Sequence, residues 1–394
     1  MKRNLNKKWI AALSILSGAA VTVSAESAPV LAQQSQNSPP LVLKFDREPQ
    51  KIAFADGDVR LAGALLEPDG RGPFPAVVLV HGAGPGTHDE PAFIVHANAF
   101  LSQGFAVLTY DKRSSGDSTG NLETSDYEDL ARDVAAAVRF LRTRSEIAPS
   151  KIGLLGRSEG AWVSTLAASH DLSIAFVIMS SGSAVNPYEQ TVYWTRRALR
   201  KKGMAEDRIE QAVNVKTSIW DYYRRVADGQ TNLPALRSDR TALVKRLSEF
   251  QQFQPELPAG IMDPDVEDRR KFAAFAHIMF YDPHPVLNAV HASLLEIIGA
   301  EDEVVDPAST LAALERLRSS GHDVTSKTFP GVGHSLLVIN GNTIVGYAEG
   351  YLEYIVAWAR DHVQTKQPCG ILGVRRPPVR LYPHIQGIPV VRVG

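Results

Sequence analysis

Cysteine is nearly absent from this sequence, with Cys369 the single one among 394 residues. An intrachain disulfide is therefore excluded, and Cys369 lies too far from the amino terminus to be a lipid-attachment site. The chain also has no excess of basic or acidic residues: its formal net charge is −1, and the basic residues are dispersed. This balance argues against a nucleic-acid-binding protein. The chain also has no internal repeat.

The remaining composition is that of an ordinary globular protein, with 44% hydrophobic and 22% charged residues. A chain of this length can form one large α/β domain with an insertion, or two domains. Residues 26–40 are rich in Ser, Gln and Pro, which predicts a disordered spacer. Residues 364–394 contain five prolines and no acidic residue, so we interpret them as a peripheral tail.

The first 25 residues differ from the rest. Four basic residues, at positions 2, 3, 7 and 8, precede an apolar stretch over residues 9–23 that ends in Val23-Ser24-Ala25. This pattern is typical of a signal peptide cleaved after Ala25, and it predicts export to the periplasm or medium. An uncleaved membrane anchor is the alternative, but the stretch is short and polar residues interrupt it. Cleavage would leave a net charge of −5.

Continuous apolar runs alternate with helix-length amphipathic segments from residue 76 onward. The runs lie at residues 76–80, 105–109, 152–155, 174–179 and 294–298, and we expect one more strand at residues 324–329. Such runs are typical of strands buried on both faces of a parallel sheet. Their alternation with helical segments predicts a doubly wound, mostly parallel α/β sheet. A hairpin formed by residues 51–55 and 59–65 is expected to precede it.

This alternation stops over a stretch of about a hundred residues, which contains apolar stripes at helical spacing and no strand-like run. We therefore expect a helical cap at residues 184–285, inserted between core segments at residues 41–183 and 286–363. The cap aromatics are expected mainly to form its own core. They are Trp194, Trp220, Tyr222, Tyr223, Phe250, Phe253, Phe272 and Phe275.

A Gly-x-Ser-x-Gly motif at residues 156–160 joins one apolar run directly to a helical pattern. A serine at the tip of such a turn holds its hydroxyl clear of the backbone, and flanking glycines avoid the clash of a Cβ. A second copy, residues 116–120, lies in a polar run with no strand directly before it. The next helix start follows several residues later, where Ser125-Asp126-Tyr127-Glu128 has the pattern of a capping box. Ser158 is therefore the candidate nucleophile, and Ser118 is a loop serine.

A serine hydroxyl needs a base to remove its proton, usually a histidine that a carboxylate orients. For a serine on such a turn, the expected chain order is serine, acid, histidine. His334 fits best, because it lies in a glycine-rich loop after the last predicted strand. Other histidines are placed less well: His284 and His291 flank a strand start, and His170 ends the helix that follows Ser158.

The orienting acid should follow the strand predicted at residues 294–298. Four acidic residues compete there. Asp302 is our choice because it lies in the turn directly beyond the strand, whereas Asp306 is near the next helix start. Glu301 and Glu303 are expected to face solvent.

Backbone amides are expected to bind the oxyanion. One is the amide of Glu159, directly after the nucleophile, and the other is assigned to Ala83 in the loop after the first long strand. His81, in the same loop, is expected to be structural.

Five motifs occur in order along the chain: Val80-His81-Gly82, Tyr110-Asp111-Lys112-Arg113, Gly156-Arg157-Ser158-Glu159-Gly160, Gly299-Ala300-Glu301-Asp302 and Gly333-His334. Together they resemble the α/β-hydrolase superfamily over residues 50–363. The chain is most similar to capped bacterial esterases and acyl hydrolases, near the dienelactone-hydrolase and prolyl-oligopeptidase-like branches. The resemblance implies structural roles for Asp111 and Arg113. The chain departs from the family at Ser114-Ser115, where glycine is common.

These observations predict an exported serine hydrolase that cleaves carboxylic esters through an acyl-enzyme, with Ser158, His334 and Asp302 as the triad. We expect a small-molecule ester as substrate, no metal or organic cofactor, no nucleic-acid partner and no stable membrane insertion after cleavage of the signal peptide. The oligomeric state stays open. A non-catalytic binding protein on the same fold is disfavoured because every expected polar position is filled.

The alternative is a serine peptidase, such as an aminopeptidase, with the same triad. Acidic residues of the cap would then bind the substrate amine, although a solvated acidic face is the competing interpretation. These residues are Asp263, Asp265, Glu267 and Asp268.

Overall fold

The computed structural model describes residues 43–230, 232–253, 256–340, 343–364 and 391–392. The predicted signal peptide, the predicted spacer and most of the predicted tail, Cys369 included, lie outside the described residues.

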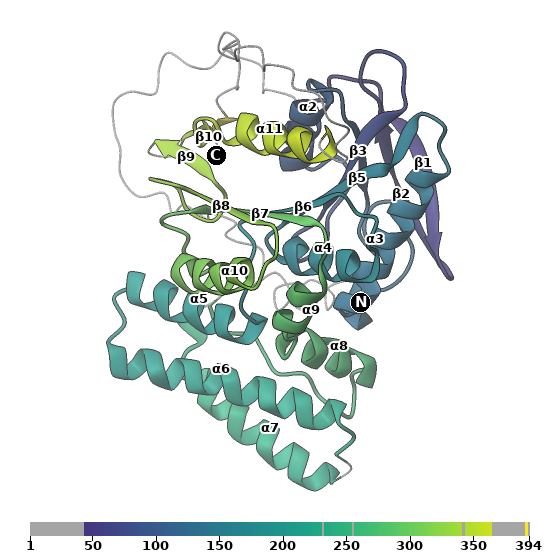
Figure 1. The fold of residues 1–394 in the computed structure, drawn as a ribbon. Coiled ribbons are helices and arrows are strands. Elements are labelled where there is room, and N and C mark those ends of the chain that lie inside the picture. Colours follow the sequence, from purple (N-terminus) through teal and green to yellow (C-terminus); the bar gives the residue numbers. More distant parts are fainter. Residues whose placement is uncertain (1–42, 231, 254–255, 341–342, 365–390, 393–394) are drawn as a thin grey trace, which may run out of the picture.

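An eight-stranded sheet forms the centre of the fold (Figure 1). Its strands are β1 (Gln50–Asp56), β2 (Val59–Leu66), β3 (Phe74–Val80), β4 (Ala106–Tyr110), β5 (Ile147–Arg157), β6 (Phe176–Ser180), β7 (Ser293–Gly299) and β8 (Val324–Phe329). Their order is β1-β2-β4-β3-β5-β6-β7-β8. β2 pairs antiparallel with β1 and β4, and the remaining neighbours are parallel. The predicted hairpin and the mostly parallel doubly wound sheet are confirmed.

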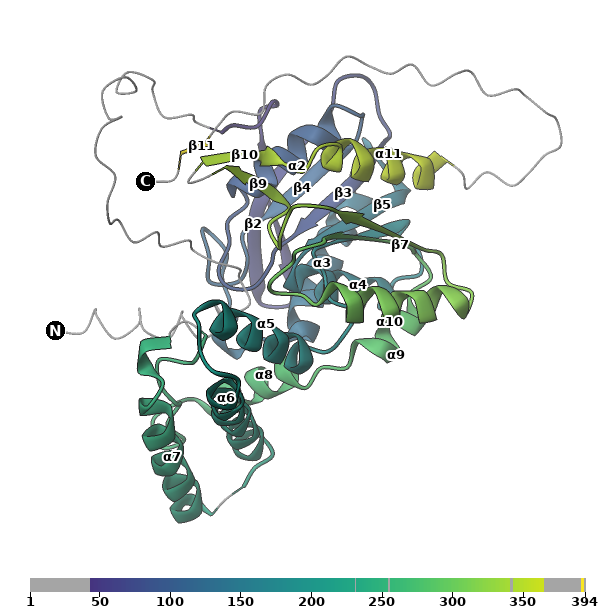
Figure 2. The ribbon, with the colours of Figure 1, turned by 90° about the vertical axis from the view of Figure 1, so that its left-hand side faces the viewer.

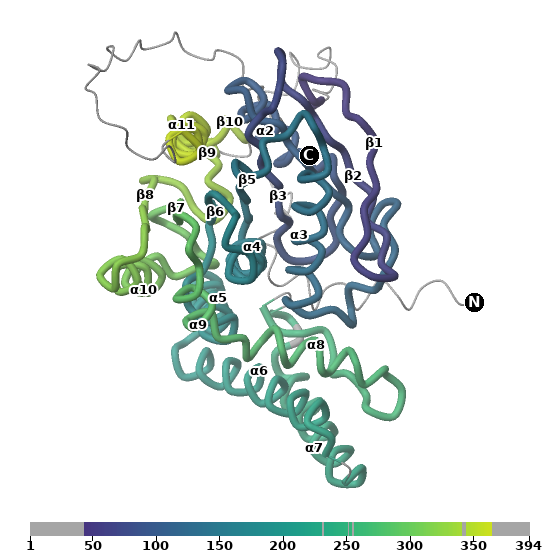
Figure 3. Tube along the Cα trace, turned by 45° about the vertical axis from the view of Figure 1, so that its right-hand side comes forward, coloured from purple at the N-terminus to yellow at the C-terminus, as the bar shows by residue number. Residues whose placement is uncertain are grey.

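Helices cover both faces of this sheet (Figures 1 and 3). One face packs against α2 (Pro91–Leu101) and α11 (Tyr351–Gln364), and the other against α3 (Tyr127–Arg142), α4 (Glu159–His170) and α10 (Pro307–Ser319). Val78 and Val80 of β3 point to the α3 side, whereas Val77 and Leu79 point to the α2 side. Because both faces are buried, the strand is apolar at every position.

The cap is the helical segment between β6 and β7. It consists of α5 (Pro187–Lys201), α6 (Glu206–Ala227), α7 (Leu233–Ser248), α8 (Arg269–Met279) and α9 (Pro283–Ala289), with the short turn η3 (Gln251–Phe253). The cap helices α5 to α8 lie together on one side of the sheet (Figure 2). Six of the eight cap aromatics pack in the cap's own core, as expected. The other two, Trp194 and Trp220, flank the buried ammonium of Lys216, at 4.6 and 5.7 Å from the ring centres.

The structure adds a small sheet that the sequence analysis does not predict. β9 (Leu337–Asn340) and β10 (Thr343–Tyr347) are antiparallel, and β11 (Val391–Arg392) pairs with β10. Val338, Ile339 and Val345 are exposed on this hairpin, so its strands lack the fully buried apolar run of the central ones. Two residues of the predicted tail thus pair with the folded core.

The helix cap predicted at Ser125 is wrong by one residue. A short turn, η2 (Leu122–Thr124), precedes the helix, and the N-cap of α3 is Asp126. The carboxylate of Asp126 accepts from the Asp129 N–H at 3.1 Å, and the Asp129 carboxylate accepts from the Asp126 N–H at 3.1 Å. The Ser125 hydroxyl instead donates to the carbonyl of Asn121 at 2.8 Å and accepts from Arg113 Nη1 at 3.3 Å.

Candidate active site

Ser158 lies between β5 and α4 with φ 51° and ψ −119°. Such a conformation costs a residue with a Cβ about 1–3 kcal/mol, so the surrounding structure must hold it. The Ser158 N–H donates to the carbonyl of Ser180 on β6, and the Ser158 carbonyl accepts from Ala161, both at 2.9 Å. Glycine is required beside the turn, because a Cβ on Gly156 would lie 2.1 Å from the carbonyl oxygen of Gly160.

The hydroxyl of Ser158 faces the ring of His334, with 3.0 Å between Oγ and Nε2. The other ring nitrogen, Nδ1, lies 2.9 Å from Oδ2 and 3.1 Å from Oδ1 of Asp302. A carboxylate accepts hydrogen bonds, so the proton of the neutral ring sits on Nδ1 and Nε2 is free to accept from the serine. His334 is 7% exposed and Asp302 is fully buried. The fold thus brings together the three side chains chosen from the sequence.

The orientation of Asp302 is fixed by several donors. The N–H groups of Val304 and Val305 donate to its Oδ1, both at 2.8 Å. The hydroxyl of Tyr193, on cap helix α5, donates to the Asp302 backbone carbonyl at 3.0 Å. Both the carboxylate and the backbone of this loop are therefore held in place around the bond to His334.

The other acids of this loop do not reach the His334 ring. Asp306 caps α10 through the Ala308 N–H at 3.2 Å, close to the predicted helix start, and Glu301 is exposed as expected. The expectation that Glu303 faces solvent is wrong. Its side chain is half-buried, and Oε2 accepts from the His334 backbone N–H at 3.2 Å. The loop after β7, which carries Glu303, therefore packs against the loop after β8, which carries His334. A local sequence pattern does not reveal such a contact.

A further carboxyl group, Glu296 on β7, is completely buried. Burial raises its pKa well above the usual value, and the negative charge of Asp302 raises the pKa further. Both effects favour the neutral form of the Glu296 carboxyl group over its carboxylate. The sequence analysis does not identify it, because it stands inside an apolar strand.

The loop after β3 passes close to the turn between β5 and α4 that carries Ser158. A Cβ on Gly82 would lie 3.3 Å from the carbonyl oxygen of Arg157 and 3.6 Å from the Cβ of Ser158. Glu159 is the first residue of α4, where backbone N–H groups have no acceptor within the helix. The two amides expected to bind an oxyanion, those of Ala83 and Glu159, thus belong to two segments that each lie close to Ser158.

His81 braces this loop. Its Nε2 donates to the backbone carbonyl of Tyr110, and its Nδ1 lies 3.0 Å from Oε1 of Glu90. Burial raises the pKa of Glu90 and the bond from His81 lowers it, with a net shift downward. Glu90 is therefore ionised, and His81 has both ring nitrogens engaged away from Ser158.

The loop after β4 is a structural scaffold. Asp111 accepts from the backbone and ring N–H groups of His88, at 2.8 and 2.7 Å. Arg113 donates to both oxygens of Asp133, at 2.7 and 2.9 Å. Ser114 has φ 63°, so it adopts the left-handed conformation that glycine takes without steric cost. The roles that the resemblance implies for Asp111 and Arg113 agree with these contacts.

The serine of the second Gly-x-Ser-x-Gly copy stabilises the same loop. The Ser118 hydroxyl donates to the Asp111 carbonyl at 2.7 Å and accepts from the Ala62 N–H at 2.9 Å. Ser118 thus joins the loop after β4 to strand β2, which agrees with its interpretation as a loop serine.

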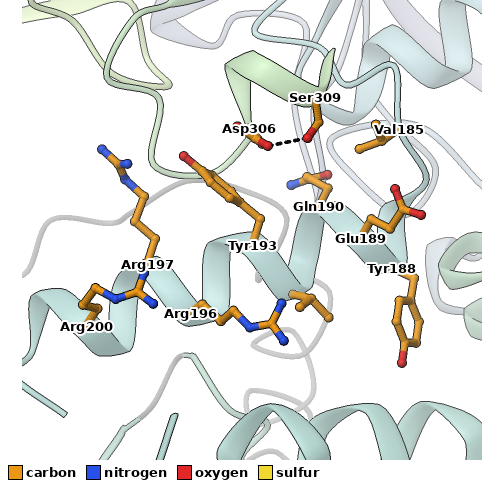
Figure 4. Close-up of a pocket in the computed structure, with 11 residues that line it drawn as sticks. Val185, Tyr188, Glu189, Gln190, Tyr193, Arg196, Arg197, Arg200, Asp306 and Ser309 are labelled. Carbon is orange, nitrogen blue, oxygen red and sulfur yellow. Dashed lines mark hydrogen bonds between the residues drawn. The ribbon is translucent and has the colours of Figure 1, made fainter. Parts of the chain in front are cut away.

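A cavity of about 430 Å³ lies between α5 and the start of α10 (Figure 4). Tyr193 and Arg197 extend from α5 along this cavity, where the Tyr193 hydroxyl donates to the Asp302 carbonyl at 3.0 Å and Arg197 to the Glu301 carbonyl at 3.5 Å. Neither Ser158 nor His334 lines this cavity. The cavity borders the backbone of the acid loop, which comprises residues 300–306 between β7 and α10, and not the side chains of Ser158 and His334.

Each acidic cap residue considered as an amine-binding group has a basic partner within the cap. The pairs are Asp263–Arg240 at 3.3 Å, Asp265–Arg237 at 2.7 Å, Glu267–Lys271 at 2.8 Å and Asp268–Arg270 at 2.6 Å. These contacts match the solvated, internally paired acidic face better than an amine site.

Within the described ranges, no group of three or more His, Cys, Asp or Glu side chains is arranged to hold a metal ion. No helix among the residues that the structure describes has the length and hydropathy needed to cross a membrane.

The sequence model of the X-Pro dipeptidyl-peptidase (S15) family matches residues 56–335, from the end of β1 to the loop that carries His334. This match covers more than half of the chain. The chain belongs to this family. The family match and the sheet topology together confirm the resemblance to α/β-hydrolases.

Several characterised proteins are similar to this S15-family chain. Esterase EstD of Thermotoga maritima is 30% identical over 41% of this chain and 40% of its own length. Quorum-quenching protein AidA of Acinetobacter baumannii is 25% identical over 67% of this chain and 82% of its own. Mouse acyl-coenzyme A thioesterase 5 is 27% identical over 49% of this chain and 44% of its own. The match to the esterase and the thioesterase thus spans less than half of either protein.

The crystal structure of a hypothetical protein from Pseudomonas aeruginosa has the same fold. It covers 86% of this chain and 100% of its own, with a TM-score of 0.50 and 16% sequence identity. The matched family and the relatives that are named an esterase and a thioesterase are hydrolases, which is the enzyme class that the sequence predicts.

Proposed function

We propose that this chain is an exported serine hydrolase that cleaves small carboxylic esters, with Ser158 as nucleophile, His334 as general base and Asp302 as the acid that orients it. One observation carries the proposal: the hydrogen-bonded series from Ser158 Oγ to His334 Nε2 at 3.0 Å and from His334 Nδ1 to Asp302 at 2.9 Å. The strained backbone of Ser158 supports it, because such strain persists where the structure over-determines a functional group.

In the acylation step, Ser158 Oγ forms a bond to the ester carbonyl carbon while His334 Nε2 takes the hydroxyl proton. The carbonyl oxygen becomes an oxyanion, which the N–H groups of Ala83 and Glu159 stabilise. Loss of one such donor typically costs about 3–4 kcal/mol. The tetrahedral intermediate then collapses, His334 returns its proton to the departing alkoxide, and the acyl group stays on Ser158.

In the second step, His334 takes a proton from water, whose oxygen attacks the acyl carbon. Ser158 leaves with the proton from His334, and the carboxylic acid is released. Asp302 remains ionised throughout and stabilises the imidazolium, while the N–H groups of Val304 and Val305 hold its carboxylate in place. The scheme uses no metal or organic cofactor.

A serine peptidase is the second candidate, because the matched family is named for X-Pro dipeptidyl-peptidases. An aminopeptidase needs an unpaired acid for the substrate amine. The cap acids considered for this role are engaged with arginine and lysine, which favours the ester. The names of the relatives, an esterase and thioesterases, favour it as well.

Export is part of the proposal and rests on the signal-peptide pattern of residues 1–25. Fractionation of cells that express the full chain, with amino-terminal sequencing of the product, tests it. We expect a periplasmic or secreted protein that begins at Glu26. A cytoplasmic protein that retains residues 1–25 would contradict export without affecting the chemistry.

The activity is tested with p-nitrophenyl esters of increasing acyl length and with aminoacyl p-nitroanilides. The wild type, Ser158→Ala and Ser118→Ala are compared. We expect ester hydrolysis that Ser158→Ala lowers by about a thousandfold or more and Ser118→Ala leaves intact. Faster cleavage of the anilides would support the peptidase instead. Undiminished turnover by Ser158→Ala would rule out the proposed nucleophile.

A further inference from the structure

Lys112 links the two segments that carry the proposed oxyanion donors. Its Nζ donates to the backbone carbonyl of Gly82 at 2.8 Å and to Oε1 of Glu159 at 2.7 Å. Gly82 belongs to the loop after β3, and Glu159 is the first residue of α4. Lys112 itself lies in the loop after β4 and is 3% exposed, like Glu159. One buried ammonium thus joins three segments that are distant in sequence.

The bond to Gly82 fixes the direction of the Ala83 amide. The Gly82 carbonyl and the Ala83 N–H belong to one planar peptide unit, which is trans because the described chain has its cis bond elsewhere, at Gly72-Pro73. In a trans unit the two groups point in opposite directions. With the carbonyl held on the buried Lys112, the Ala83 N–H points away from that ammonium.

The second donor is fixed in a related way. The Glu159 N–H shares its peptide unit with the Ser158 carbonyl, which accepts from Ala161 at 2.9 Å. The Glu159 side chain adds the ion pair to Lys112. Rotation of either peptide unit would therefore break a hydrogen bond.

The energetics indicate a role beyond packing. Two buried charges cost several kcal/mol each in lost hydration, and their attraction does little more than offset this. An apolar pair of similar volume would fill the same space at equal or better stability. Apolar side chains cannot hold the Gly82 carbonyl, which would then be free to rotate or left without a donor.

We propose that Lys112 is a positioning residue for the oxyanion site: by binding Gly82 and Glu159 together, it keeps the Ala83 and Glu159 amides aimed at the same point. This inference rests on the proposed function, since it requires that these amides serve a nucleophilic Ser158. Lys112 does not touch the substrate, so its loss lowers kcat and leaves the substrate affinity nearly unchanged.

The test compares Lys112→Met with Glu159→Gln, using p-nitrophenyl butyrate and rates expressed per active site that reacts with a fluorophosphonate. Normalisation removes the effect of any unfolded fraction. We expect Lys112→Met to lower kcat about 10- to 100-fold, less than the full loss of a donor, with KM within about threefold. Glu159→Gln keeps the Lys112–Gly82 bond, so its kcat should fall less. A normal kcat in Lys112→Met, or a rise in KM alone, would overturn the proposal.

A double variant separates positioning from stability. Lys112→Met leaves the Glu159 charge buried and unpaired, and Lys112→Met/Glu159→Leu removes both charges. We expect the double variant to regain thermal stability relative to Lys112→Met but to keep the low kcat, because Gly82 stays unanchored. Recovery of kcat would mean that Lys112 acts through stability alone.

Failure of the proposed function has a different signature. If Ser158→Ala still reacts with the fluorophosphonate or still turns over substrate, the nucleophile is wrong, and the Lys112 inference is lost with it. If Ser158→Ala is inert while Lys112→Met has a normal kcat, the proposed function stands and the positioning role alone is rejected.

Discussion

Tyr193 of the cap donates its hydroxyl to the backbone carbonyl of Asp302 at 3.0 Å, so helix α5 is tied to the loop that carries the proposed acid. The tyrosine comes from the inserted helices and the aspartate from the core sheet. The cap therefore supports the site through the backbone of Asp302.

Replacement of Tyr193 by phenylalanine should weaken this support. Loss of one hydrogen bond is worth about 1 kcal/mol, so we expect kcat to fall about fivefold while KM changes little. Steady-state kinetics with p-nitrophenyl butyrate measure both. Tyr188→Phe is the control, because Tyr188 lies on the same helix and points away from the acid loop (Figure 4). Equal losses in both variants would contradict a specific role for Tyr193.

Replacement of Asp302 by asparagine should nearly abolish turnover. The amide keeps the shape of the carboxylate but removes the charge that stabilises the His334 imidazolium and selects its tautomer, so we expect kcat to fall by about 10³–10⁴. Glu301→Gln serves as a control in the same loop, because the Glu301 side chain is exposed. Asp302→Asn with more than a tenth of wild-type kcat would exclude Asp302 as the orienting acid.

Ser118→Ala should affect stability and not chemistry. The variant leaves the Ala62 N–H without its acceptor and the Asp111 carbonyl without its donor. We expect the free energy of unfolding to fall by about 1–2 kcal/mol, as measured by urea denaturation. A loss of kcat per labelled active site, larger than twofold, would show that Ser118 takes part in catalysis.

Stability should fall in acid because of His96. Burial lowers the pKa of this histidine from 6.5 to about 4, and its Nδ1 donates to the Ala92 carbonyl while Nε2 accepts from the Tyr351 hydroxyl at 2.8 Å. Between pH 6.5 and 4 the unfolded chain binds a proton that the folded chain does not. The free energy of unfolding therefore decreases as the pH falls through this window, by up to about 1.4 kcal/mol per pH unit.

His96→Leu provides the matched comparison, since leucine does not titrate. At pH 7.5 the wild type should be the more stable protein, because the variant loses the buried bond to Tyr351. The difference should shrink by about 2 kcal/mol between pH 6.5 and 4.5 in urea titrations. A constant difference across this range would show that His96 has an ordinary pKa in the folded protein.

Local patterns in the sequence were sufficient to predict the central sheet. Most of its parallel strands are buried on both faces, so each of these is a short apolar run that stands out from its surroundings. The edge strand β8 differs, because only Val324 and Phe329 are buried in it. The hairpin of β9 and β10 cannot be predicted in this way, because its strands are short and Val338, Ile339 and Val345 are exposed. The burial of Glu296 cannot be predicted either, because a single carboxyl group inside an apolar strand forms no sequence pattern.

The three side chains of the candidate site follow from their positions at strand ends, because the carboxyl ends of parallel strands meet at one edge of the sheet. Contacts between loops do not follow. Lys112 and Glu159 are 47 residues apart, and nothing local indicates that one ammonium joins Glu159 to Gly82. The hydrogen bond from the His334 N–H to the Glu303 carboxylate likewise has no local signal in the sequence.

The central claim is that Ser158 is the nucleophile, and the most direct test is to locate a covalent adduct. The mature wild type is treated with a fluorophosphonate, digested, and its peptides are sequenced by mass spectrometry. The account predicts one modified residue, Ser158, and no adduct in His334→Ala over the same time. An adduct on Ser118 or another residue, or no adduct in an active preparation, would contradict it.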